Sequence, residues 1–242
     1  MGMLAMVFVA SLLGGFVQGV AGFGALVVVM IVLPYFMPLK LATALAGLGT
    51  LPTNFVMSCK YRQKIRYKTV IIPLAFYFLS MTIFVHLAAA INLESLKPVF
   101  GLFMMGLSVY FSYFSSKIHV QNNLRNAILC MVVAGFTASF FGISGPVFVL
   151  YYVSVLADKE QYIGTMAFIF LLAELFGGLV RYLNGFFSLS DFPVVLMELS
   201  GMLLGSQIGN RLVSRIDGAK LKKIVYGMLA ISGAMTFVKG IL

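Results

Sequence analysis

Two carboxylates of this sequence lie well inside apolar runs, where an ionisable group is costly and is commonly functional. Glu174 lies in the run 161–183 and Glu198 in the run 192–213. An apolar environment disfavours the charged carboxylate, so either side chain could take up and release a proton. We therefore predict proton coupling for Glu174 and Glu198. The alternative is a protonated, hydrogen-bonded glutamic acid with a purely structural role.

Polar amides and hydroxyls accompany these carboxylates. Asn54 precedes Glu174 by 120 positions and lies in the apolar run 41–59, with Thr50 one helical turn before it. Gln18 lies in an uncharged run that extends from Met3 to Phe36. Neutral hydrogen-bonding groups of this kind suit a solute inside a membrane protein, and we predict that Gln18, Thr50 and Asn54 contact a substrate.

Two glycine-rich stretches, 14–25 and 135–146, interrupt long apolar runs and again lie 120 positions apart. The matched pairs are Gly15 and Gly135, Phe16 and Phe136, and Gly22 and Gly142. An unbroken helix over 3–36 would be about 51 Å long, whereas a bilayer core is about 30 Å thick. Each helical glycine also costs close to 1 kcal/mol relative to alanine. We therefore predict a duplicated broken helix.

Broken backbone at membrane depth is tolerated only inside protein or beside a watery cavity. A helix that restarts after a break presents free N–H groups and a positive dipole end, which favour an anion. Two such ends that face each other would hold an anion without a buried Lys or Arg. The break residues that this predicts as substrate-binding are Gly22, Phe23, Gly24, Ala25, Gly142, Ile143, Ser144 and Gly145. The alternative is that the glycines only allow close helix packing.

The composition defines the class of protein. Of the 242 residues, 61% are hydrophobic and 10% are charged, against about 25% charged in soluble domains. The mean hydropathy of +1.04 predicts an all-α polytopic membrane protein. The net charge of +10 comes from basic residues between apolar runs, which is typical of membrane orientation and not of nucleic-acid binding. A stripe of Gly201, Gly205 and Gly209 predicts a helix-packing face.

The apolar runs fall into two similar halves. The unbroken spans that we expect are 41–59, 69–91 and 98–114 in the first half and 161–183, 192–213 and 224–242 in the second. The segment 115–123 has the composition of a linker, so we expect one membrane domain made of a first repeat, 1–118, and a second repeat, 119–242.

Loop charge indicates how the halves are related. If each half crosses the membrane an odd number of times, thirteen Lys and Arg lie on one side and four, including Arg181, on the other. An even number divides them nine to eight. The positive-inside rule favours the first division and so predicts inverted repeats, each with a re-entrant pair of short helices plus three spans. The basic loops 60–68 and 211–223 would be cytoplasmic and both termini outside. The alternative is eight spans in parallel repeats.

The duplicated motif, in two halves of four segments each, resembles the TauE/SafE family of sulfite and organosulfonate exporters over essentially the whole chain. The resemblance implies a permease of the bacterial inner membrane for sulfite, sulfoacetate or related sulfonates, driven by proton-linked secondary transport. Many members read Gly-x-Gly-Gly-Gly at the breaks. Here the matching stretches are Gly22-Phe23-Gly24-Ala25 and Gly142-Ile143-Ser144-Gly145-Pro146, so that Ser144 stands in place of a glycine.

Two other classes of function compete with transport. An intramembrane enzyme would need a nucleophile with a base or a metal cluster, and the two histidines, His86 and His119, lie far apart in the sequence. A structural subunit of a larger complex would not explain two duplicated breaks. We therefore expect no enzymatic activity, no cofactor and no metal. The expected partners are the lipid bilayer and a small anion. The sequence leaves open whether the chain forms a homodimer.

Overall fold

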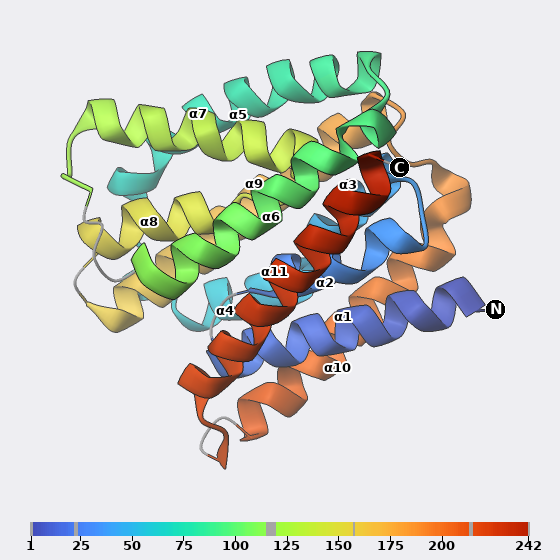
Figure 1. Cartoon of the computed structure of the whole chain (residues 1–242). Coiled ribbons are helices and arrows are strands. Elements are labelled where there is room, and N and C mark those ends of the chain that lie inside the picture. Colours follow the sequence, from blue (N-terminus) through green and yellow to red (C-terminus); the bar gives the residue numbers. More distant parts are fainter. Residues whose placement is uncertain (1, 22–23, 115–119, 157, 213–214, 242) are drawn as a thin grey trace.

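The computed structural model describes residues 2–21, 24–114, 120–156, 158–212 and 215–241. The regular elements in these ranges are all helices, which pack as one bundle (Figure 1). Seven of the helical segments are long and apolar enough to cross a membrane. The prediction of an all-α polytopic membrane protein is confirmed.

The helices follow the predicted runs closely. The predicted first repeat contains α1 (Gly2–Ala21), α2 (Ala25–Val32), α3 (Leu39–Leu48), α4 (Leu51–Lys60), α5 (Tyr67–Ala90) and α6 (Lys97–Val109), which continues as a π-helical turn over Tyr110–Phe114. The second contains α7 (Leu124–Phe141), α8 (Gly145–Val155), α9 (Lys159–Leu183), α10 (Phe192–Leu212) and α11 (Gly218–Ile241). The predicted boundary between 118 and 119 lies outside the described residues.

Both glycine-rich stretches interrupt the helices as predicted. Gly24 (φ 103°) directly precedes α2, and Gly142 (φ 68°) ends α7, and both have the left-handed backbone that favours glycine. The prediction of two short helices at each break was wrong in one respect. The first member is long enough to cross a membrane, 20 residues in α1 and 18 in α7, and only the second is short.

The span predicted over 41–59 is not continuous. It divides into α3 and α4 around Gly49 and Thr50, so the prediction of an unbroken helix was wrong. Pro52 lies in the first turn of α4 and has no N–H to donate to the carbonyl four residues before it. The Thr50 N–H instead bonds Gly47 O, three residues back, at 3.1 Å. The matching helix of the second repeat, α9, is unbroken.

Glycines bring α1 and α10 into backbone contact. A Cβ atom on Gly201 would lie 2.6 Å from the Phe8 carbonyl oxygen, and one on Gly209 would meet the Phe16 carbonyl oxygen. Gly205 faces the Leu12 carbonyl oxygen between them. The predicted packing role of the glycine stripe is therefore confirmed. The contacts advance together along both chains, so α1 and α10 run parallel.

The long helix before each break packs against a helix of the other half. While α1 packs most extensively on α10, α7 packs on α5, so each broken helix lies against the other repeat. Helices at equivalent positions of the two predicted repeats, here called repeat mates, also pack on each other. These pairs are α6 with α11 and the α3–α4 segment with α9. Gly101 meets Phe237, whereas Ser108 bonds Tyr226 O at 2.7 Å, so α6 and α11 run antiparallel.

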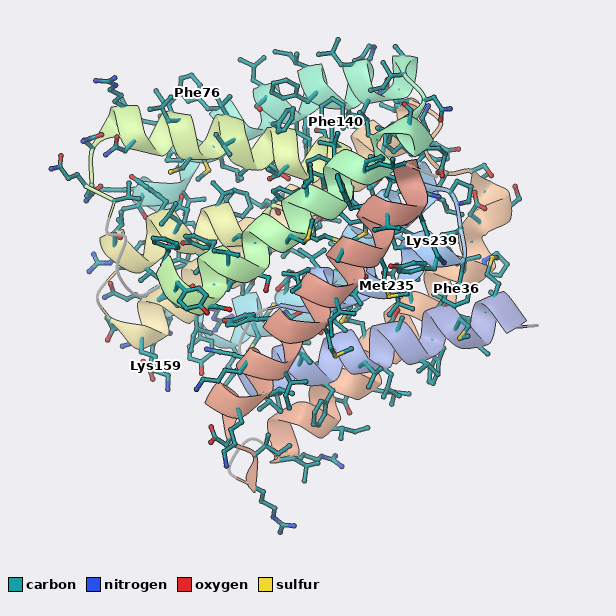
Figure 2. All side chains as sticks on the ribbon, in the orientation of Figure 1. Phe36, Phe76, Phe140, Lys159, Met235 and Lys239 are labelled. Carbon is teal, nitrogen blue, oxygen red and sulfur yellow. The ribbon has the colours of Figure 1, made fainter. Side chains whose placement is uncertain are left out.

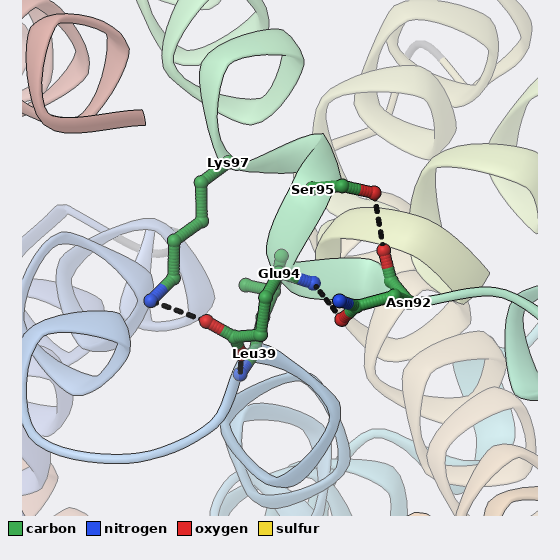
Figure 3. A network of polar contacts seen from close by, with 5 residues as sticks. All are labelled: Leu39, Asn92, Glu94, Ser95 and Lys97. Atoms are coloured by element: carbon green, nitrogen blue, oxygen red, sulfur yellow. Dashed lines mark hydrogen bonds and ion pairs between the residues drawn. The ribbon is translucent and has the colours of Figure 1, made fainter. Parts of the chain in front are cut away.

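A polar network fixes the start of α3 at one end of the bundle (Figure 3). The carboxylate of Glu94 accepts the Leu39 N–H at 2.6 Å and pairs with Lys97. Asn92 orders the same turn, because its side chain accepts the Glu94 N–H at 3.1 Å. A carboxylate at a helix N-terminus satisfies a free N–H and complements the dipole. Glu94 therefore ties the α5–α6 connection to α3.

Candidate functional site

A cavity of about 370 Å³ lies where the breaks converge. Its wall includes residues from α1, α2, α4, α8 and α9. Of the residues predicted to bind substrate, it contains Gln18, Gly24, Ala25, Thr50, Asn54, Ile143 and Gly145. Both repeats therefore contribute to one cavity.

Two helix starts lie on the wall of this cavity. α2 begins at Ala25, directly after Gly24, and the Val28 N–H closes its first turn on Gly24 O at 3.0 Å. α8 begins at Gly145, with Pro146 in its first turn, where a missing N–H costs least. The N-terminal residues of both helices line the cavity. Helix starts carry free N–H groups and a partial positive charge, so the wall suits an anion.

Part of the cavity wall, contributed by the start of α4, is polar. Asn54 is 4% exposed, and its amide donates to Thr50 Oγ1 at 3.1 Å. Thr50 in turn donates to Gly47 O at 2.9 Å. The break between α3 and α4 thus places an oriented hydroxyl and amide on the cavity wall. Thr53, which lines the cavity beside them, donates to Ser206 Oγ at 3.2 Å.

Several predicted site residues lie elsewhere. Gly142 packs against Thr43, and Ser144 is buried at 1% exposure with an unpartnered hydroxyl; neither lines the cavity. Gly22 and Phe23 lie outside the described residues.

The family of the chain follows from comparison with known proteins. A family model described as sulfite exporter TauE/SafE matches residues 7–236, nearly the whole chain. The chain belongs to the TauE/SafE family. All the residues that line the cavity fall within the matched range. Comparisons with curated proteins and with solved structures give no match.

In this TauE/SafE chain the two intramembrane carboxylates flank the break between α3 and α4. Glu174 is 4% exposed and packs on Gly47, while Glu198 is fully buried against Gly49, with its carboxyl carbon 2.7 Å from where a Cβ would lie. Neither carboxylate lines the cavity, whereas Thr50, directly after Gly49 in the chain, does. Both Glu198 oxygens lack a hydrogen-bond partner. The carboxylates therefore lie immediately behind the polar wall.

Sequence reasoning missed several residues of this TauE/SafE site. Lys159 and Asn210 are exposed and also line the cavity, which places its mouth where α9 begins and α10 ends. Figure 2 shows Lys159 at this end of the bundle and Lys239 toward the other. Arg181, counted as a loop cation, is 2% exposed inside α9. The signal for Lys159 was its position two residues before the predicted span 161–183. Nothing in the hydropathy indicated burial of Arg181.

Proposed function

We propose that this membrane protein is a secondary transporter of small sulfur-containing anions, such as sulfite, sulfoacetate or other organosulfonates. The anion binds in the cavity between the starts of α2 and α8, near the bilayer midplane. Gln18 and Asn54 are the hydrogen-bond donors, and Thr50 contacts the anion and orients the Asn54 amide. The observation that carries the proposal is one cavity lined by both breaks of a TauE/SafE chain. Glu174 and Glu198 carry the coupling protons.

The two repeats are inverted in this proposal, and alternating access follows from their movement around the cavity. The antiparallel packing of repeat mates supports the inversion, because a two-fold axis in the membrane plane reverses one mate relative to the other. The cavity mouth at Lys159 lies beside the exposed basic residues of the loop 60–68, since Lys64 pairs with Glu160 at 3.4 Å. By the positive-inside rule this end faces the cytoplasm of a bacterial inner membrane.

Counterflow in proteoliposomes tests transport directly. Vesicles loaded with unlabelled sulfite are expected to accumulate labelled sulfite transiently, and sulfoacetate and thiosulfate define the breadth of the site. Asn54→Ala is expected to raise the sulfite KM about tenfold, because a hydrogen bond to a charged group contributes about 1.5–3 kcal/mol. Gln63→Ala, which removes an exposed amide that does not line the cavity, should change nothing.

Counterflow also separates transport from the other classes. Intact protein that moves no small anion would support a structural subunit or an enzyme instead. An unchanged KM in a well-folded Asn54→Ala variant would place the anion elsewhere.

Cysteine labelling tests the inversion. Lys64 and Asn184 are repeat mates, 120 positions apart. Lys64 lies at the start of α9, where it pairs with Glu160, whereas Asn184 follows the other end of this 25-residue helix, about 37 Å away. With Cys59 and Cys130 replaced by alanine, we expect Lys64→Cys to react only from the cytoplasm and Asn184→Cys only from outside. Reaction of both from one side would contradict the inversion.

A further inference from the structure

Arg181 is a buried cation whose hydrogen bonding is incomplete. It lies in the last turn of α9 and is 2% exposed. Its Nη2 donates to Ala138 O at 2.7 Å, next to the end of α7. Nε and Nη1 have no partner, and no carboxylate of the described residues lies within 4 Å of the guanidinium. A buried charge without an ion-pair partner is strongly destabilising. The guanidinium therefore lacks an anionic acceptor.

Glu174 does not supply that acceptor. It precedes Arg181 by seven residues on α9, which is about 10.5 Å along the helix axis. Its carboxylate is directed toward Gly47. The two charges interact through space, but they form no ion pair.

Two further buried donors come from neighbouring elements. The hydroxyls of Tyr77 on α5 and of Ser144 in the second break approach one another without a well-aligned hydrogen bond, and both are buried without a partner. A Cβ on Gly177 would lie 3.0 Å from Arg181 Nη1 and 2.7 Å from Met81 Cε, so the guanidinium lies beside α5, one helical turn from Tyr77. Both the Glu174 and the Arg181 charges act on Tyr77. A guanidinium with free N–H groups beside two hydroxyl groups matches an oxoanion, which accepts a fork of hydrogen bonds from arginine.

This cluster lies directly behind the cavity. Ile143 and Gly145, on either side of Ser144 in the chain, line the cavity, while Ser144 is buried and does not line it. The second break, which carries Ser144, therefore separates the two places. Arg181 lies toward the end of α9 that is remote from the cavity mouth at Lys159.

We propose that Arg181, Tyr77 and Ser144 form a second anion site, behind the second break, for a small oxoanion such as sulfite. The site deepens the proposed function and rests on it. The cavity receives the anion from one side of the membrane, and the Arg181 site holds it on the way to the other.

Equilibrium binding of radiolabelled sulfite to the purified full-length chain tests this site. We expect two sulfite ions per wild-type chain. Tyr77→Phe and Ser144→Ala keep the Arg181–Ala138 hydrogen bond and should weaken one of the two sites severalfold. Arg181→Lys keeps the charge but loses the fork, and should weaken that site about tenfold or more. Asn54→Ala should weaken only the other site.

Two exposed residues provide controls. Tyr182→Phe and Arg211→Gln change the same side-chain types at exposed positions and should leave both sites intact. One sulfite per wild-type chain, or two sites that all three cluster variants leave unchanged, would overturn the second site while wild-type counterflow upholds transport. Absence of both binding and counterflow in wild-type protein would remove the proposed function, and the second site with it.

Discussion

Replacing Gly205 with leucine is expected to prevent the chain from reaching its native fold. Gly205 lies midway along α10, and a Cβ at this position would overlap the Leu12 carbonyl oxygen and its carbonyl carbon, at 2.8 Å, in α1. The obstacle is backbone, which cannot rotate away as a side chain can. Overpacking a core costs typically 1–3 kcal/mol, and a leucine against a helix backbone should exceed that, which is a large fraction of a native stability of about 5–15 kcal/mol.

Gel filtration and thermal unfolding of the detergent-purified variant check this expectation. We expect Gly205→Leu to aggregate or to be degraded, and Gly205→Ala to fold with a clearly lowered melting temperature. Gly227→Leu is the matched control, because Gly227 is exposed on α11 and a Cβ there would meet nothing within 4 Å. A Gly205→Leu protein that melts like wild type would show that the close contact of α1 and α10 is not needed.

The sequence was most informative where backbone chemistry repeats. Both breaks follow from glycines 120 positions apart, because glycine disfavours a helix interior whatever surrounds it. The four-residue spacing of Gly201, Gly205 and Gly209 likewise predicted a packing face, although it did not identify α1 as the partner. The convergence of Gln18, Asn54 and Gly145 on one cavity also matched the expectation from the repeat. These features depend on local preferences and on symmetry, and both are visible in one sequence.

The predictions were wrong where tertiary packing determines helix continuity and side-chain burial. An apolar run indicates a span, but it did not show that Pro52 divides α3 from α4. Arg181 was counted among loop charges because it lies near the end of an apolar run, while its burial depends on Ala138, 43 positions away. Lys159 joins the cavity only because α9 begins at its mouth. The inverted relation of the repeats stays a prediction, supported by helix direction.

Glu174→Gln is expected to abolish transport driven by a pH gradient and to spare exchange. The side chain is 4% exposed and packs against Gly47, one helical turn before the cavity residue Thr50. Protonation of Glu174 removes the negative charge at its contact with Gly47, so it can shift the conformation of the break between α3 and α4. Glutamine has the shape of a protonated carboxylic acid but cannot take up or release a proton. The cavity of the variant should therefore still bind the anion, while transport is no longer coupled to proton movement.

Two assays on the same vesicles separate these steps. Sulfite accumulation under an imposed pH gradient should fall to background in Glu174→Gln, whereas sulfite counterflow at equal pH should stay within about twofold of wild type, since a shape-conserving change at a buried site costs little binding energy. Glu160→Gln is the control, because Glu160 is exposed and pairs only with Lys64 among the described residues. An unchanged pH dependence in Glu174→Gln would assign coupling to Glu198, whose own glutamine variant should then lose it.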